Sequence, residues 1–248
     1  MKKILSAIVL ALFFVGTLGV SFAASKDVPS PNIKQKVFVY WPKYARGKRP
    51  PQPPIGPTCS TTGNDQEPTY LVGGWFMPDT GGGYVINVST APSNLKPNTP
   101  SVINASFQTW TNADPAQIFT YQGTTSIKSA RRDGQNVIIW KGITSSAIAI
   151  TYLWYRTDTG ELLEADTIFN NNLPWSINDP TKGDCGGDPG SYDVQNVATH
   201  EFGHWVGLLD LYENKDAALT MYGYGALGEL KKSTLGAGDI LGVNAVAP

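Results

Sequence analysis

The sequence contains few of the residues that mark several common protein classes. It has two histidines, two cysteines and three methionines in 248 residues, and its formal net charge is -1. Without a concentrated basic face, a nucleic-acid partner is not expected. Two cysteines allow one intramolecular disulfide, which excludes a cysteine-rich scaffold. The apolar content of 41% is enough for a sizeable core.

A long hydrophobic run occurs only at the N-terminus. Lys2 and Lys3 precede an apolar run over residues 4–20, and small residues stand close to Ala23. This pattern predicts a secretory signal peptide over residues 1–23, whereas an uncleaved membrane anchor would need a longer run. We therefore expect a secreted chain that has no stable membrane association after signal cleavage.

Residues 24–68, called here the N-terminal arm, precede a predicted main domain over residues 69–248. Residues 24–57 carry a net charge of +6 and residues 58–248 a net charge of -9, so the two regions should attract each other. The arm holds one short strand-like run, residues 36–40, followed by a proline-rich stretch that favours extended geometry. It is interpreted as a linker, a propeptide, a clamp on the main domain or a solvated tail.

The main domain combines helical and strand patterns. Pro100 supplies a helix start, and apolar residues recur at helical spacing from Val102 to Trp110, which predicts a helix ending before Asn112. A second helix is predicted over residues 194–209, after a polar, glycine-rich loop. Runs rich in β-branched and aromatic residues predict the strands of one sheet, at residues 84–88, 118–121, 137–140, 147–155 and 163–169.

The most informative stretch reads His-Glu-Phe-Gly-His, from His200 to His204. Residues four apart in a helix lie on one face, so both imidazoles can reach one metal ion while Glu201 remains free to act on water. Zinc in hydrolases uses such neutral imidazole ligands and keeps one position open for water. Both histidines of the chain are in this motif, so no histidine remains as a third ligand.

The third ligand is predicted from the turn that follows. Gly207 can end the helix in a left-handed conformation and return the chain toward the metal. Asp210 then arrives where a third ligand belongs. Glu213 and Asp216 are the nearby alternatives, and each can also be a solvated surface charge.

The stretch from His200 to Asp210 resembles the long zinc motif of the metzincin metallopeptidases, in a matrixin-like bacterial or archaeal branch. Most of that clan carries histidine at the last position, and the aspartate found here is similar to the snapalysin variant. The run Leu-Thr-Met-Tyr-Gly at residues 219–223 looks like the methionine-containing turn of the family. Further similar stretches, at residues 164–170, 192–199 and 238–244, extend the resemblance over about residues 70–248.

The resemblance implies an α+β fold, with a twisted, mostly parallel sheet, two long helices and a small irregular C-terminal subdomain. It implies that Asp210 completes the zinc site with His200 and His204, and that Met221 forms a hydrophobic floor beneath the ion. Tyr222 is either a stabiliser of the tetrahedral oxyanion or a packed aromatic residue. The substrate is expected to lie extended along a sheet edge.

These residues together predict a secreted zinc-dependent endopeptidase that acts on a protein or peptide substrate. Zinc would polarise the scissile carbonyl and acidify water, and Glu201 would take the proton and pass it to the leaving amine. A small-molecule amidase or esterase and a non-catalytic secreted zinc-binding protein are the alternatives. The oligomeric state is left open.

Two further expectations concern the loops. Cys59 is expected to form a disulfide with Cys185, the alternative being a propeptide thiolate that occupies the open position on zinc. Calcium is a candidate structural ion near Asp184, Asp188 and Asp193, although acidic loops are usually just solvated.

Overall fold

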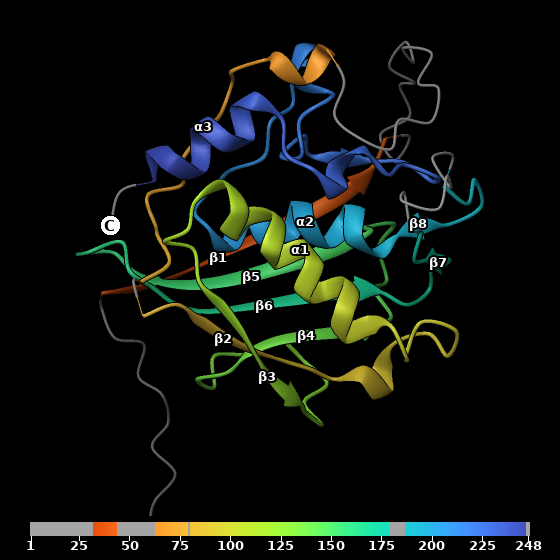
Figure 1. The fold of residues 1–248 in the computed structure, drawn as a ribbon. Coiled ribbons are helices and arrows are strands. Elements are labelled where there is room, and N and C mark those ends of the chain that lie inside the picture. Colours follow the sequence, from red (N-terminus) through yellow and green to blue (C-terminus); the bar gives the residue numbers. More distant parts are fainter. Residues whose placement is uncertain (1–31, 44–62, 79, 179–186, 247–248) are drawn as a thin grey trace, which may run out of the picture. The chain divides into compact units, whose positions relative to one another are not determined.

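A mixed sheet with helices over one of its faces forms the fold (Figure 1). The structure is a computed structural model and describes residues 32–43, 63–78, 80–178 and 187–246. The predicted signal peptide, the proposed Cys59–Cys185 disulfide and Asp184 lie outside these residues. No helix within the described ranges is long and apolar enough to cross a membrane.

Seven strands form the main sheet, in the order β3 (Phe119–Thr124), β2 (Gly82–Ile86), β4 (Asn136–Lys141), β6 (Leu162–Asn170), β5 (Ala149–Arg156), β1 (Ile33–Pro42) and β9 (Tyr224–Gly225). Neighbours from β3 to β6 are parallel, β5 is antiparallel to β6 and β1, and β1 is parallel to β9. The sheet is therefore mixed and mostly parallel, and the predicted α+β class is confirmed. Each strand predicted in the main domain falls on an observed one, with small shifts at the ends.

The sequence of β4 shows why the sheet is buried on two sides. Ile138 and Trp140 pack into the main core, whereas Val137 and Ile139 belong to a smaller apolar cluster with Val85. Successive side chains of a strand point to opposite faces, so a continuous apolar run needs cover on both. The helices cover the face that carries the main core (Figure 1).

Two helices, α1 (Thr99–Ala113) and α2 (Val194–Trp205), lie side by side on that face. The ring of Phe107 stacks on that of Phe202 with centroids 3.7 Å apart, and the indole Nε1 of Trp110 donates to the Thr199 carbonyl. The first predicted helix is confirmed. Packing of α1 against α2 supports residues 200–204 on the side of the helix that faces α1.

The helix α2 begins at a side-chain cap and ends just before a glycine with positive φ. The Asp193 carboxylate caps its first turn by accepting a hydrogen bond from the backbone N–H of Asn196 at 2.8 Å. The predicted end at residue 209 is wrong, since the helix stops at Trp205. The cause is Gly207, whose φ of +106° turns the chain away from the helix axis.

After α2 the chain is largely irregular until α3 (Ala237–Ala245). The short elements of the described chain are η1 (Gly63–Gln66), η2 (Val88–Thr90), β7 (Trp175–Ser176), β8 (Tyr192–Asp193), η4 (Asn214–Asp216) and η5 (Lys231–Ser233). The strands β7 and β8 form a separate parallel pair. The strand-like run of the N-terminal arm becomes β1, a full strand of the main sheet.

Candidate metal centre

Both histidines of the chain are buried on α2, one turn apart. Nδ1 of His200 lies 2.7 Å from the Thr220 carbonyl oxygen, and Nδ1 of His204 lies 2.9 Å from that of Leu208. A carbonyl oxygen only accepts, so each Nδ1 carries the proton and donates it. When the imidazole is neutral, the other nitrogen, Nε2, is unprotonated, which is the form that binds a metal.

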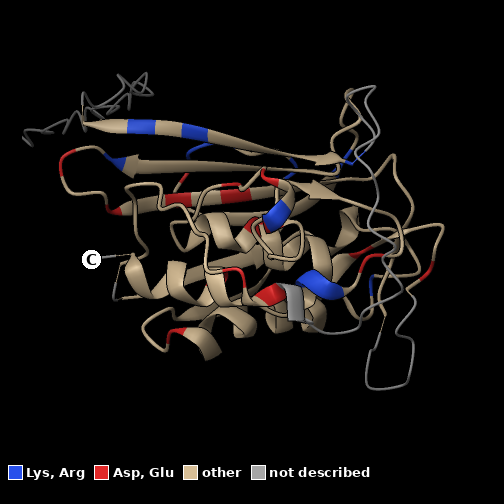
Figure 2. Cartoon of the chain, turned by 90° about the horizontal axis from the view of Figure 1, so that it is seen from above, with Lys and Arg blue, Asp and Glu red and all other residues tan. Residues whose placement is uncertain are grey.

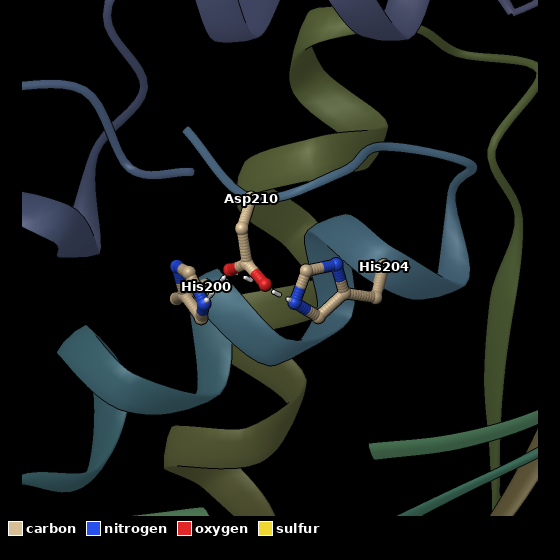
Figure 3. Close-up of side chains that lie close together, drawn as sticks. All are labelled: His200, His204 and Asp210. Carbon is tan, nitrogen blue, oxygen red and sulfur yellow. Dashed lines mark ion pairs between the residues drawn. The ribbon is translucent and has the colours of Figure 1, made fainter. Parts of the chain in front are cut away.

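Asp210 completes the group, as Figure 3 shows. Its Oδ1 lies 3.2 Å from Nε2 of His200 and 3.5 Å from Nε2 of His204. The three ligand atoms lie within 4.8 Å of one another. Gly207 makes this possible, because a Cβ there would stand 2.6 Å from the backbone oxygen of Trp75.

The alternative third ligands do not join this group. Glu213 is exposed, and Asp216, although buried, belongs to η4. Within the described residues, the cluster of His200, His204 and Asp210 is the one group of three or more His, Cys, Asp or Glu side chains that can hold a metal ion. Asp188 instead accepts hydrogen bonds from Gly190 and Ser191, and the calcium expectation remains a prediction.

The electrostatics of the group suit a cation. Burial lowers the pKa of His200 to about 4, so its imidazole is neutral at neutral pH. Burial would raise the pKa of the Asp210 carboxyl, but the two histidines hold that pKa well below its usual range. In the described part of the chain, Nε2 of His200 and Oδ1 of Asp210 are buried without a hydrogen-bond partner. Buried polar atoms are normally paired, and a bound cation would satisfy both.

Glu201 stands apart from the three ligands. Its Oε2 accepts a hydrogen bond from the Thr151 hydroxyl on β5 at 2.5 Å, while Oε1 is buried and has no hydrogen-bond partner among the described residues. Burial raises the pKa of the Glu201 carboxyl to about 7. A carboxyl with that pKa can both accept and release a proton near neutrality.

The side chain of Met221 packs against α2 at Gly203. A Cβ on Gly203 would stand 2.1 Å from the Met221 sulfur, so the helix has no room for a side chain at this position. The Asp239 carboxylate accepts hydrogen bonds from the backbone N–H groups of Thr220 and Met221, at 2.8 and 3.0 Å. The turn is thereby fixed, and with it the Thr220 carbonyl that orients His200.

Tyr222 is buried among aromatic residues. Its ring lies edge-on to that of Tyr224, with centroids 5.6 Å apart, and its carbonyl accepts a hydrogen bond from Nζ of Lys232. These are the contacts of a packed aromatic residue. A role in stabilising an oxyanion remains a prediction.

Several residues around the centre were not found by sequence reasoning. Phe38 and Tyr40 of β1 stack on the two histidines, Thr151 holds Glu201, and Lys232 reaches the hydroxyl of Tyr40. The strand-like run at residues 36–40 contains both aromatic residues, but its sequence does not indicate which segment they contact.

The chain matches no protein-family model and no curated protein. The residues of the candidate metal centre therefore carry the functional assignment.

Proposed function

We propose that this chain is a secreted zinc-dependent endopeptidase. The observation that carries the proposal is the buried group of His200, His204 and Asp210, whose unpaired Nε2 and Oδ1 atoms face one another beside the separately held carboxylate of Glu201. Catalytic zinc sites use three protein ligands and keep a fourth position for water or substrate. Two neutral imidazoles and one carboxylate fit that set.

A zinc ion held by these residues would supply a Lewis acid that lowers the pKa of water and polarises a carbonyl group. The chain's own contribution is Glu201. The Thr151 hydroxyl fixes one carboxylate oxygen and leaves Oε1 free to take a proton from water and return it to the leaving amine.

The segments around His200 and His204 support the proposal that the chain is a matrixin-like metzincin. The ligand-bearing helix ends at a left-handed glycine, the third ligand follows at Asp210, and Met221 packs beneath the helix at Gly203. The N–H of each imidazole is held by a backbone carbonyl, which orients the ligands. A structural zinc site usually fills all four positions with protein groups, whereas this group has three potential ligands and the carboxylate of Glu201 held apart from them.

The test is metal content combined with cleavage. We expect the purified protein to contain about one zinc per chain, and to cleave denatured casein in a reaction that a chelator stops and added zinc restores. Hydrolysis of small esters without cleavage of casein would instead support the amidase or esterase alternative. Bound zinc with neither activity would support a non-catalytic zinc-binding protein.

A further inference from the structure

The strand β1 occupies the position between β5 and β9, which we call the edge site. It pairs antiparallel with β5 from Ile33 to Tyr40 and parallel with β9 at Trp41 and Pro42. Without β1, the hydrogen-bonding edge of β5 would be open. Extended peptides bind to such an edge through main-chain hydrogen bonds. The edge site is thus a place for a peptide, and the chain fills it with its own residues.

The strand also covers the metal centre. The ring of Phe38 stacks on that of His204 with centroids 3.7 Å apart, and the ring of Tyr40 stacks on that of His200 with centroids 4.0 Å apart. If the proposed function is right, a peptide bond must be brought to this same place. A substrate and β1 therefore exclude each other, and β1 has to leave the edge site before cleavage.

Tyr40 is held by a set of contacts that we call the Tyr40 site. Its hydroxyl accepts a hydrogen bond from Nζ of Lys232 at 2.5 Å, and its side chain is almost fully buried. Gly225 of β9 lies against the ring, since a Cβ there would stand 2.8 Å from Cε1 of Tyr40 and 2.9 Å from Cδ1 of Ile148. The site therefore fits an aromatic ring with a polar group at its far end.

The base of the Tyr40 site is chemically specific. Lys232 is fully buried, and its ammonium also donates to the carbonyl oxygens of Tyr222 and Tyr224, at 2.6 and 2.8 Å. In its charged form Nζ has three N–H donors, and the Tyr40 hydroxyl is the third acceptor after the carbonyl oxygens of Tyr222 and Tyr224. A phenylalanine would fit in size but would leave one buried N–H unpaired, which is costly.

We propose that residues 33–42 are a tethered occupant of the peptide-binding edge site, and that Lys232 makes the Tyr40 site selective for a tyrosine side chain. The inference rests on the proposed function. The preferred substrate is a polypeptide that binds in the direction of β1 and places tyrosine on His200. The end of β1 is further held by the ion pair between Lys43 and Glu229, at 3.2 Å. Figure 2 shows further basic residues along β1, which carries Lys34 and Lys36.

A permanent structural strand would behave differently from a tethered occupant. Its side chains would stabilise the active fold, so weakening them would lower activity. Weakening a tethered occupant would instead raise activity, because the substrate competes with β1 for one place. The exposed Val37 offers a matched control on the same strand, since its side chain is on the opposite face from Phe38 and Tyr40.

The first experiment measures binding and does not depend on catalysis. A fluorescent decapeptide with the sequence of residues 33–42 is titrated into zinc-loaded Glu201→Gln chain that also carries Tyr40→Ala. We expect the peptide to bind this chain at least about tenfold more tightly than the Glu201→Gln chain that carries Val37→Ala in place of Tyr40→Ala. Replacing the peptide's tyrosine with phenylalanine should weaken its binding about tenfold. Adding Lys232→Met should abolish the preference for tyrosine.

The second experiment measures hydrolysis of a peptide substrate by the full chain. Tyr40→Phe removes only the hydroxyl contact and Tyr40→Ala removes the ring, and both should raise the rate relative to Val37→Ala. A lower rate of hydrolysis by folded Tyr40→Phe and Phe38→Ala chains would overturn the proposal that β1 is a tethered occupant. Equal binding of the tyrosine and phenylalanine peptides would overturn the selectivity. Selective binding without any hydrolysis would refute the proposed function and leave this inference standing.

Discussion

Glu201 and the proposed metal ligands are neighbours with separate proposed roles, and substitution can distinguish the two roles. Glu201→Gln keeps the size of the side chain and an acceptor for the Thr151 hydroxyl but removes the base. We expect zinc content to be unchanged and casein cleavage to fall by about a hundredfold or more. Glu213→Gln, at an exposed carboxylate, is the control and should keep full activity. Retained cleavage by the Glu201 variant would refute its assignment as the base.

Thr151 acts on the reaction only through Glu201. Its hydroxyl donates to Oε2 of Glu201 and lies 2.8 Å from the hydroxyl of Thr167, which accepts a hydrogen bond from the indole of Trp205. Thr151→Val keeps the shape but leaves the buried carboxylate short of a donor. We expect kcat to fall about tenfold or more while zinc content stays the same.

Thr151→Ser distinguishes positioning from packing. Serine restores the hydroxyl but lacks the methyl group, so it should recover most of the lost kcat if the hydrogen bond matters. If the valine and serine variants lose kcat equally, Thr151 has only a packing role. This residue could not be found from the sequence, because it lies 50 positions from Glu201 on another element.

At the scale of elements, the N-terminal turn of α3 fixes the backbone at residues 220 and 221, next to the candidate metal centre. The Asp239 carboxylate accepts hydrogen bonds from the backbone N–H groups of Thr220, Met221 and Gly236. Asp239→Asn has a single acceptor oxygen and loses at least one of these bonds. We expect the free energy of unfolding to fall by about 1–3 kcal/mol. Ile240→Ala, at an exposed position on the same helix, should change stability far less, as chemical denaturation can show.

Local patterns predicted α1, the start of α2 and strands β2 to β6, but not α3, and long-range pairing limited the rest of the prediction. The start of α1 followed from Pro100, and the runs of β-branched residues fell on strands, because both signals are contained in adjacent residues. The helix α2 was predicted too long because apolar residues continue past Gly207. The inclusion of β1 in the sheet depends on pairing with Tyr155 and its neighbours, more than a hundred residues away. Basic and proline-rich flanks gave no signal of that partner.

At the scale of the whole molecule, the candidate site joins parts that are distant in the sequence. The spacing of His200 and His204 on one helix predicted two ligands, and Gly207 with Asp210 predicted the third. Their surroundings come from elsewhere, since β1 supplies the rings over the histidines and η5 supplies Lys232. A sequence motif can specify donors at local spacing, but it cannot specify which distant segment will cover them.

Zinc should also stabilise the whole fold, because the ligand atoms are preassembled in the core and are scattered in the unfolded chain. A ligand present at a thousand times its Kd stabilises the native state by about 4 kcal/mol. For a domain of this size, that corresponds to a rise in Tm of about 8 to 16 °C. We expect such a difference between the zinc-loaded protein and the same protein in excess chelator, measured by calorimetry.

The rise in Tm on zinc binding, measured in two variants, identifies the third ligand. Asp210→Ala removes the carboxylate that lies between the two histidines, so its Tm should respond little to zinc or chelator. Glu213→Ala changes an exposed carboxylate nearby and should keep the full response. Magnesium should not replace zinc, because it prefers oxygen ligands to imidazole. If Asp210→Ala kept the zinc response and Glu213→Ala lost it, the chain would bind the ion through a different carboxylate, and the preassembled group would not be the metal centre.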